Sequence, residues 1–272
     1  MLIESAAGAP ERTDALNPAV GAHDWHVIHP ELDMFSPKNG YNPATHSATY
    51  SAEFLKKYFA AQAARSTELI QEAQARLAKI EKGEGMFKDD EPFVVAGSTI
   101  GINGARALLA DTRLMGHIHS PHTLLKADGT RPVIAYPTTM EPEASAEGNN
   151  LFYANTLVTT VKSYLSFQAL RVSPDYHVTE DNIVGVDWRS VPNSIEGNLQ
   201  GIRVPTLIVS GTCAPHIVYH EIAYNLSAAT DKELVGVEGG NHGLTACRPE
   251  FGDVSKRAYD YVDSWINKPG RF

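Results

Sequence analysis

Two kinds of hydrophobic pattern divide this chain. From Ser51 to about Lys82, apolar side chains recur about every 3.6 residues, and Lys and Glu occupy the other side, which predicts a long amphipathic helix. Ser51 is placed to cap its first turn, and Gly83 to end it. Residues 8–50 are rich in Pro, Gly, Asn and His, so we expect turns there rather than regular elements.

The middle of the chain carries a weaker pattern. Residues 91–97 and 131–136 predict short strands. Residues 105–115 and 151–171 place apolar side chains at helical spacing, whereas residues 173–200 show no regular period. We therefore expect a middle part that is mainly helical and rich in loops.

The C-terminal part has the clearest pattern. Residues 204–211 (VPTLIVSG) and 233–238 (ELVGVE) are nearly continuous apolar runs, as in strands buried on both faces of a parallel sheet. Helical patterns follow at residues 220–227 and 254–266, and this alternation predicts right-handed βαβ units. The first residues, LIES at 2–5, look like the end of another buried strand with an acidic residue at its end.

Composition narrows the protein class. The 272 residues are 43% hydrophobic and carry a net charge of -9, which excludes disordered and collagen-like classes. No basic patch indicates a nucleic-acid partner, no apolar run approaches the roughly 20 residues of a membrane helix, and no signal peptide is visible, so we expect a cytoplasmic protein. Cys213 and Cys247 follow neighbouring predicted strands and can lie close together, although such cysteines are more often free and partly buried.

One family resemblance emerges from the C-terminal pattern. VPTLIVSG, the helix after it, ELVGVEGGNHG and the last amphipathic helix together resemble the final two strand–helix units of the α/β-hydrolase superfamily. The resemblance is good over residues 200–267 and loose elsewhere. It implies an α/β-hydrolase-like parallel sheet with an incomplete core and a large, mainly helical cap. The implied boundaries are a core strand at 1–9, a cap or lid at 10–200 and the C-terminal core at 201–272.

The resemblance also implies catalytic residues. In the family, the loop after the last strand carries the catalytic His, and His242 holds that position here. Parallel sheets gather catalytic groups at the carboxyl ends of their strands, where a His can take a proton from a nucleophilic Ser. The acid departs from the family pattern, because Ala214 stands where its Asp is expected. Glu4, at the end of the N-terminal strand, is the first candidate to orient His242, and Glu221 is the second.

The nucleophile has no good match in the sequence. Only residues 97–101 (GSTIG) approach the family's Gly-x-Ser-x-Gly elbow, and they put Thr99, beside Ser98, in the nucleophile position. The β-methyl group of threonine crowds such a tight turn, and too few strands precede the segment. The resemblance therefore implies that the chain starts midway through the fold, with the Ser nucleophile and its oxyanion hole outside this sequence.

Together these inferences predict ester hydrolysis by a Ser-His-acid mechanism, with a small or medium apolar ester-like substrate and without a metal or organic cofactor. His117, His119 and His122 lie close in sequence but lack further ligands at matched spacing, so a polar loop is favoured over a metal site. Two alternatives stay open: a non-catalytic binding or scaffold protein, and a fragment that needs a complementing N-terminal half. An exposed strand edge would then favour a homodimer or a complementing chain.

Overall fold

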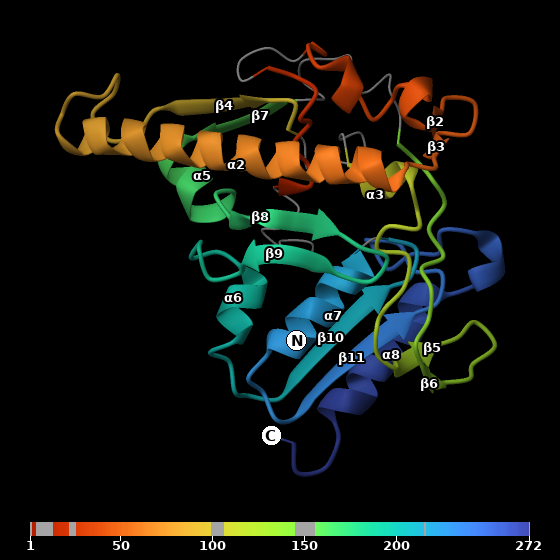
Figure 1. Ribbon diagram of the computed structural model, residues 1–272. Helices are drawn as coiled ribbons and strands as arrows, with labels where there is room; N and C mark the ends of the chain where they lie inside the picture. Colours follow the sequence, from red (N-terminus) through yellow and green to blue (C-terminus); the bar gives the residue numbers. More distant parts are fainter. Residues whose placement is uncertain are drawn as a thin grey trace.

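The computed structural model describes residues 2–3, 13–21, 26–98, 106–144, 156–214 and 216–271. Figure 1 shows two regions. The α2 region is built around the long helix α2 (Ala52–Glu81), and the sheet region is built around the strands β10 (Thr206–Gly211) and β11 (Lys232–Val237). These elements confirm the long helix and the two buried strands that the sequence predicts.

The sheet region contains a five-stranded sheet in the order β1-β10-β11-β5-β6. β1 (Leu2–Ile3), β10, β11 and β5 (His122–Leu125) run parallel, and β6 (Val133–Ile134) is antiparallel to β5. All residues of β10 are buried, because it pairs on both edges and is covered on both faces. Leu2–Ile3 thus form a strand next to β10, and residues 4–9 of the predicted N-terminal strand lie outside the described residues.

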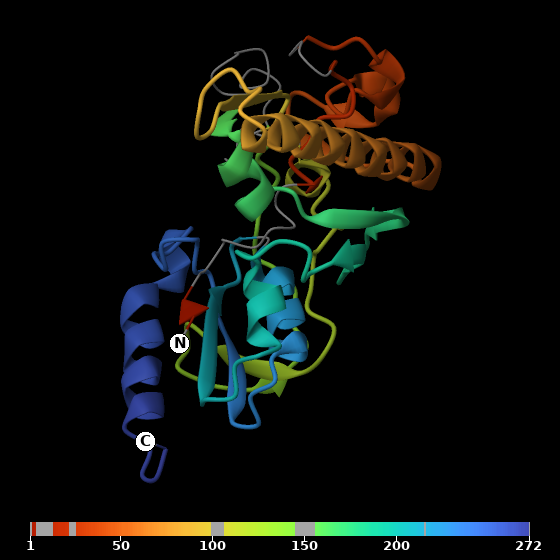
Figure 2. The ribbon, with the colours of Figure 1, turned by 90° about the vertical axis from the view of Figure 1, so that its left-hand side faces the viewer.

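Helices cover both faces of this sheet, as the view in Figure 2 shows. On one face, α8 (Val254–Ile266) packs against Leu207 and its neighbours, and on the other, α7 (His216–Leu226) and α6 (Ile195–Leu199) pack against Ile208. Leu207 and Ile208 belong to different clusters because successive side chains of a strand point to opposite faces. The cap of α8 is Asp253, which accepts the Lys256 N–H at 2.9 Å.

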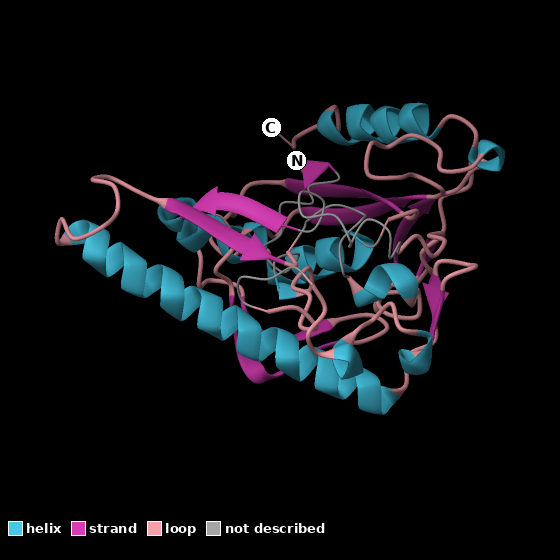
Figure 3. Cartoon of the chain, turned by 90° about the horizontal axis from the view of Figure 1, so that it is seen from above, coloured by secondary structure: helices cyan, strands magenta, loops and turns pink. Residues whose placement is uncertain are grey.

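The α2 region begins at the predicted cap, where Ser51 Oγ accepts the Phe54 N–H at 3.1 Å. The C-terminal half of α2 packs against α5 (Val161–Phe167) and the antiparallel pair of β4 (Pro92–Ala96) and β7 (Thr156–Thr160), beside which it runs in Figure 3. None of the described helices, α2 included, is long and apolar enough to cross a membrane.

Shorter elements join the two regions. β8 and β9 form an antiparallel hairpin that packs between α2 and the sheet region, and β2 and β3 form a second small pair. The bounds of the remaining elements are η1 (Pro30–Leu32), η2 (Pro37–Asn39), β2 (Tyr41–Asn42), β3 (Ser47–Ala48), α3 (Ala107–Ala110), β8 (Arg171–Val178), β9 (Ile183–Asp187) and η4 (Pro249–Phe251).

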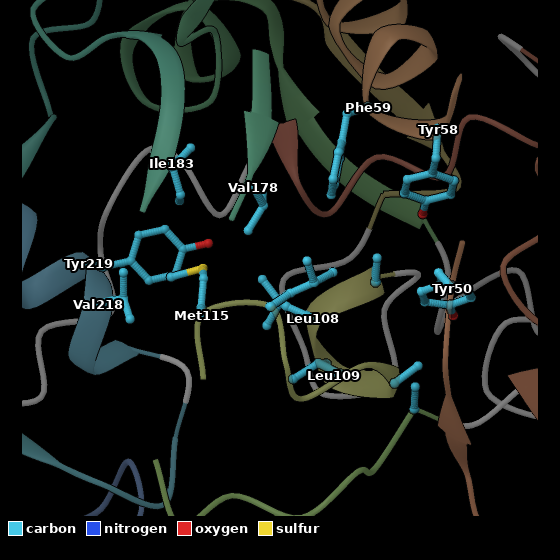
Figure 4. Close-up of a cluster of buried hydrophobic side chains, with 14 of the residues drawn as sticks. Tyr50, Tyr58, Phe59, Leu108, Leu109, Met115, Val178, Ile183, Val218 and Tyr219 are labelled. Carbon is cyan, nitrogen blue, oxygen red and sulfur yellow. The ribbon is translucent and has the colours of Figure 1, made fainter. Parts of the chain in front are cut away.

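A continuous hydrophobic core connects the regions (Figure 4). Tyr58 and Phe59 come from α2, Leu108 from α3, Val178 from β8 and Val218 from α7, and all five are buried in one cluster. Burying apolar surface stabilises a fold by about 25 cal/mol per Å². The shared core therefore holds α2 in place over the amino end of α7.

The expected fold class, an α/β-hydrolase-like parallel sheet with a large, mainly helical cap, is wrong. The sheet is small: β1 and β6 have two residues each, and β6 is antiparallel. The expected cap is not a helical layer either, because three two-stranded antiparallel sheets form among its described residues. The described chain is a mixed α/β structure with one small sheet and several strand pairs.

Strands replace predicted helix or loop at several places. Residues 156–160 form β7 instead of the start of a helix, because the run TLVTT is rich in β-branched side chains and pairs with β4 along its length. Residues 171–187, predicted mostly irregular, form the β8–β9 hairpin, whose pairing shifts between Val172 and His177. That irregularity breaks the period-2 pattern by which a strand is recognised. Of the helix predicted at 105–115, only α3 is present in the described residues.

Candidate functional site

The carboxyl ends of β10 and β11 bring two loops into close contact. The Cys213 N–H donates to the Gly240 carbonyl at 2.8 Å, and the Gly239 N–H donates to Thr212 Oγ1 at 2.9 Å. Gly211 has no space for a Cβ, because the backbone of Gly240 lies directly against its Cα. The side chains that leave these loops are therefore held at a fixed spacing.

His242 projects from the loop after β11, and its side chain is exposed. The preceding residue holds the turn: Asn241 Oδ1 accepts the N–H groups of Gly243 at 2.9 Å and Thr245 at 3.1 Å. Leu244 closes the turn with a φ of 51° and a buried side chain. The loop thus presents the imidazole on an anchored turn.

A second histidine lies beside it. His216, the first residue of α7, places its ring centroid 5.0 Å from that of His242, with 54° between the ring planes. One helical turn further, the His220 ring lies 6.4 Å from that of His216. His220 is buried, and its Nδ1 lies 2.7 Å from Ser210 Oγ of β10. Three imidazoles therefore extend from the exposed loop to the buried end of β10.

A buried ion pair anchors the first turns of α7. The Tyr219 hydroxyl donates to Asp14 Oδ2 at 2.6 Å, and Arg106 donates to the same oxygen through Nη2 at 3.0 Å and Nε at 3.2 Å. All three side chains are buried. Because removing one partner of such a pair leaves a buried charge behind, this cluster strongly constrains the orientation of α7.

One carboxyl group, that of Glu143, interacts electrostatically with both Arg106 and His216. Burial raises the pKa of Glu143, and the positive charges of Arg106 and His216 oppose that rise in part. Its backbone N–H donates to the Leu109 carbonyl at 3.0 Å, which fixes the segment that carries it. A carboxyl group with a raised pKa that interacts with an imidazole is typical of sites that transfer protons.

A disulfide links the two loops. Cys213 and Cys247 are bonded, with their Cα atoms 6.4 Å apart. The Cys247 N–H also donates to the Gly239 carbonyl at 2.9 Å. The two cysteines thus lie together, as their positions after neighbouring strands allowed, but the favoured expectation that they are free is wrong. Disulfides are rare in the cytoplasm, so this bond is unusual for the location expected from the sequence.

Glu221, the second candidate acid, points to a different part of the structure. Its carboxylate accepts the N–H groups of His119 and Ser120, both at 2.7 Å, and lies 3.4 Å from His122 Nε2. Burial raises the pKa of Glu221, but these donors outweigh it, and the pKa is lowered overall. We call Glu221, His119, Ser120, His122 and Asp181 the clamp, since they hold the strand β5 against α7.

The clamp also accounts for the histidine-rich segment. His119 Nδ1 lies 2.7 Å from Asp181 Oδ2, and His117 Nε2 lies 4.0 Å from Glu180 Oε1, both at the turn between β8 and β9. In the part of the chain that the structure describes, no group of three or more His, Cys, Asp or Glu side chains is arranged to hold a metal ion.

The structure places the other sequence candidates as follows. Glu4 and Thr99 lie outside the described residues. Ser98 is buried and forms a bridge to Leu16 of the N-terminal segment. Ala214 is buried beneath the site. Of the predicted catalytic residues in the described ranges, only His242 belongs to the cluster that it forms with His216 and His220.

Sequence reasoning missed His216, His220 and Glu143. The first two carried a usable signal, because histidines four residues apart lie on one face of a helix. That signal was hidden because α7 begins at His216, earlier than the predicted start at residue 220. Glu143 lies in an irregular acidic segment whose sequence gives no indication of an interaction with Arg106 or His216.

Comparison with known proteins adds nothing to this geometry: no family model, no curated protein and no solved structure matches the chain.

Proposed function

We propose that this chain supplies the proton-transfer residues of an ester hydrolase, with His242 as general base. The observation that carries the proposal is the contact between His242 and His216, whose rings lie 5.0 Å apart at the carboxyl ends of two parallel strands. Catalytic groups gather at this end of parallel strands because loops from several strands converge there.

The surroundings of His242 favour a catalytic role for this side chain over a purely structural one. His242 is exposed to an incoming substrate, whereas His220 is buried and hydrogen-bonded to Ser210. Glu143 adds a carboxyl group that His216 stabilises in its ionised form when the imidazole is protonated. An imidazole cluster with one exposed member and a neighbouring carboxyl group can accept a proton and hold the charge that results.

In the proposed reaction, His242 takes the proton of a serine hydroxyl as its oxygen attacks the ester carbonyl. The same proton then passes to the departing alkoxide, which leaves as the alcohol, and an acyl-enzyme remains. Water attacks the acyl group in the second step and gives a proton to His242, which passes it to the departing serine oxygen, so that the acid is released and the serine hydroxyl and neutral imidazole are restored. The serine comes from outside this sequence, and the substrate is a small or medium apolar ester.

The proposal is tested with p-nitrophenyl acetate and butyrate, activated esters that a site histidine can hydrolyse without a serine. We expect saturable hydrolysis that falls about 10²-fold or more in His242→Ala. His119→Ala is the matched control, because His119 is also exposed but contacts Asp181 at the clamp. It should keep the full rate.

Two results would contradict the proposal. Hydrolysis that persists at the original rate in His242→Ala, or that does not saturate with ester, would remove His242 as the base. A fluorophosphonate probe tests the serine separately: we expect no labelling of this chain, and a labelled serine within it would place the nucleophile inside the sequence.

A further inference from the structure

The disulfide lies at the point where the two loops of the histidine site meet. Cys213 precedes His216 by three residues, and Cys247 follows His242 by five. We propose that Cys213 and Cys247 are positioning residues: as a disulfide they hold His242 against His216, and their reduction by a dithiol lowers the rate of proton transfer. This inference rests on the proposed function, because it concerns regulation of the same site.

Other contacts hold each loop on its own. The turn around His242 is closed by Asn241, and the start of α7 is fixed by the bond from Tyr219 to Asp14. Neither set of contacts depends on the disulfide. Loss of the bond therefore leaves both histidines on ordered segments but removes the covalent link between those segments.

The described links between the loops lie near the strand ends. Besides the disulfide, they include the Cys213 N–H to the Gly240 carbonyl, the Thr212 N–H to the Val237 carbonyl, and the Gly239 N–H to Thr212 Oγ1. His242 lies beyond these bonds, on the exposed side of the loop. Small rotations of the loop about them change the ring separation, and shifts of about 1 Å in a catalytic group can cost about 10²-fold in rate.

The bond is accessible to a reductant, since both cysteines are partly exposed. A dithiol thiolate attacks one sulfur and forms a mixed disulfide, and its second thiol then closes a ring and releases the protein thiol. The dithiol is oxidised by two electrons, and Cys213 and Cys247 each gain one hydrogen. The reaction reverses in the presence of an oxidised dithiol.

The experiment compares the oxidised protein, the protein reduced with dithiothreitol and the variant Cys213→Ser/Cys247→Ser. For hydrolysis of p-nitrophenyl butyrate, reduction should lower kcat about tenfold while KM changes little. The double variant should match the reduced protein and should not respond to dithiothreitol. Reoxidation should restore kcat in the unsubstituted protein alone.

Structural readouts separate this inference from the proposed function. Nuclear Overhauser contacts between the His216 and His242 ring protons should be present in the oxidised protein and weakened after reduction, whether or not the protein hydrolyses esters. Far-UV circular dichroism should show that the reduced protein and the double variant stay folded. An unchanged kcat and unchanged ring contacts in protein shown by mass spectrometry to be reduced would overturn the positioning role.

Discussion

Two groups of histidines border α7, the clamp and the site formed by His216, His220 and His242, and they differ in their partners. In the clamp, His119 and His122 face carboxylates, and Glu221 of α7 accepts two backbone N–H groups as well. In the site, His216 and His242 face each other, and the carboxyl group of Glu143, which interacts with His216, has a raised pKa. Imidazoles paired with ionised carboxylates stabilise structure, whereas an exposed imidazole beside another can exchange protons with a ligand.

The first prediction compares the loss of one histidine from each cluster. His216→Ala should lower ester hydrolysis about 10²-fold, because His242 loses its neighbour, with little change in stability. His122→Ala should do the reverse, because it removes the buried partner of Glu221 but touches neither site histidine. Kinetics and urea unfolding on both variants measure this. If His122→Ala costs more activity than His216→Ala, the distinction between the clusters fails.

The second prediction concerns the clamp carboxylate. Glu221→Gln should lower the free energy of unfolding by about 2 kcal/mol, because the amide cannot accept both N–H groups and the charge opposite His122 is lost. Glu180→Gln is the matched control, since that side chain is 73% exposed, and it should change stability by less than about 0.5 kcal/mol. Equal losses in the two variants would show that Glu221 is not a structural anchor.

Glu221 also makes the stability that the clamp contributes depend on pH, in a direction that its pKa sets. The folded-state pKa of Glu221 is lowered from 4.5, so its contribution is present above that pH and is lost as the pH falls through the folded value. The difference in stability between the unsubstituted protein and Glu221→Gln should therefore shrink in acid. Urea unfolding at neutral pH and at a series of pH values below 4.5 measures it, and a constant difference would contradict the assignment.

The smallest expected effect is at the surface of the clamp. Contact with Asp181 raises the pKa of His119, so Asp181→Asn should return it toward 6.5. The stabilisation from this pair is present below that pH and disappears as the pH rises through the folded value. NMR titration of the His119 ring protons measures the shift, with Glu180→Gln as the control. A titration unmoved by Asp181→Asn would show that the contact does not persist in solution.

The sequence predicts elements whose pattern is set by burial on a simple period. α2, β10, β11 and α8 were found because their apolar positions repeat at helical spacing or run without interruption. β7 and the β8–β9 hairpin were missed because their pairing partners decide their conformation, and a pairing partner is not visible in a local window. The predicted fold class was wrong for the same reason, because strand pairing decides it and pairing cannot be seen in a local window.

The site was predictable only in part. His242 was located because it follows a recognisable buried strand. Its contact with His216 depends on where α7 begins and on how closely the two glycine-containing loops approach, and neither is encoded in a local pattern. Glu143 comes to the site through the packing of an irregular segment, which depends on contacts distant in sequence.

The bond between Tyr219 and Asp14 has a consequence for the order of folding. The two residues are 205 positions apart, so their contact forms only after almost the whole chain has been synthesised and compacted. The β10–α7–β11 unit is local by comparison and can assemble first. We therefore expect the N-terminal segment to dock onto an existing helix, so that a contact of high sequence separation, made late in folding, sets the geometry around His216.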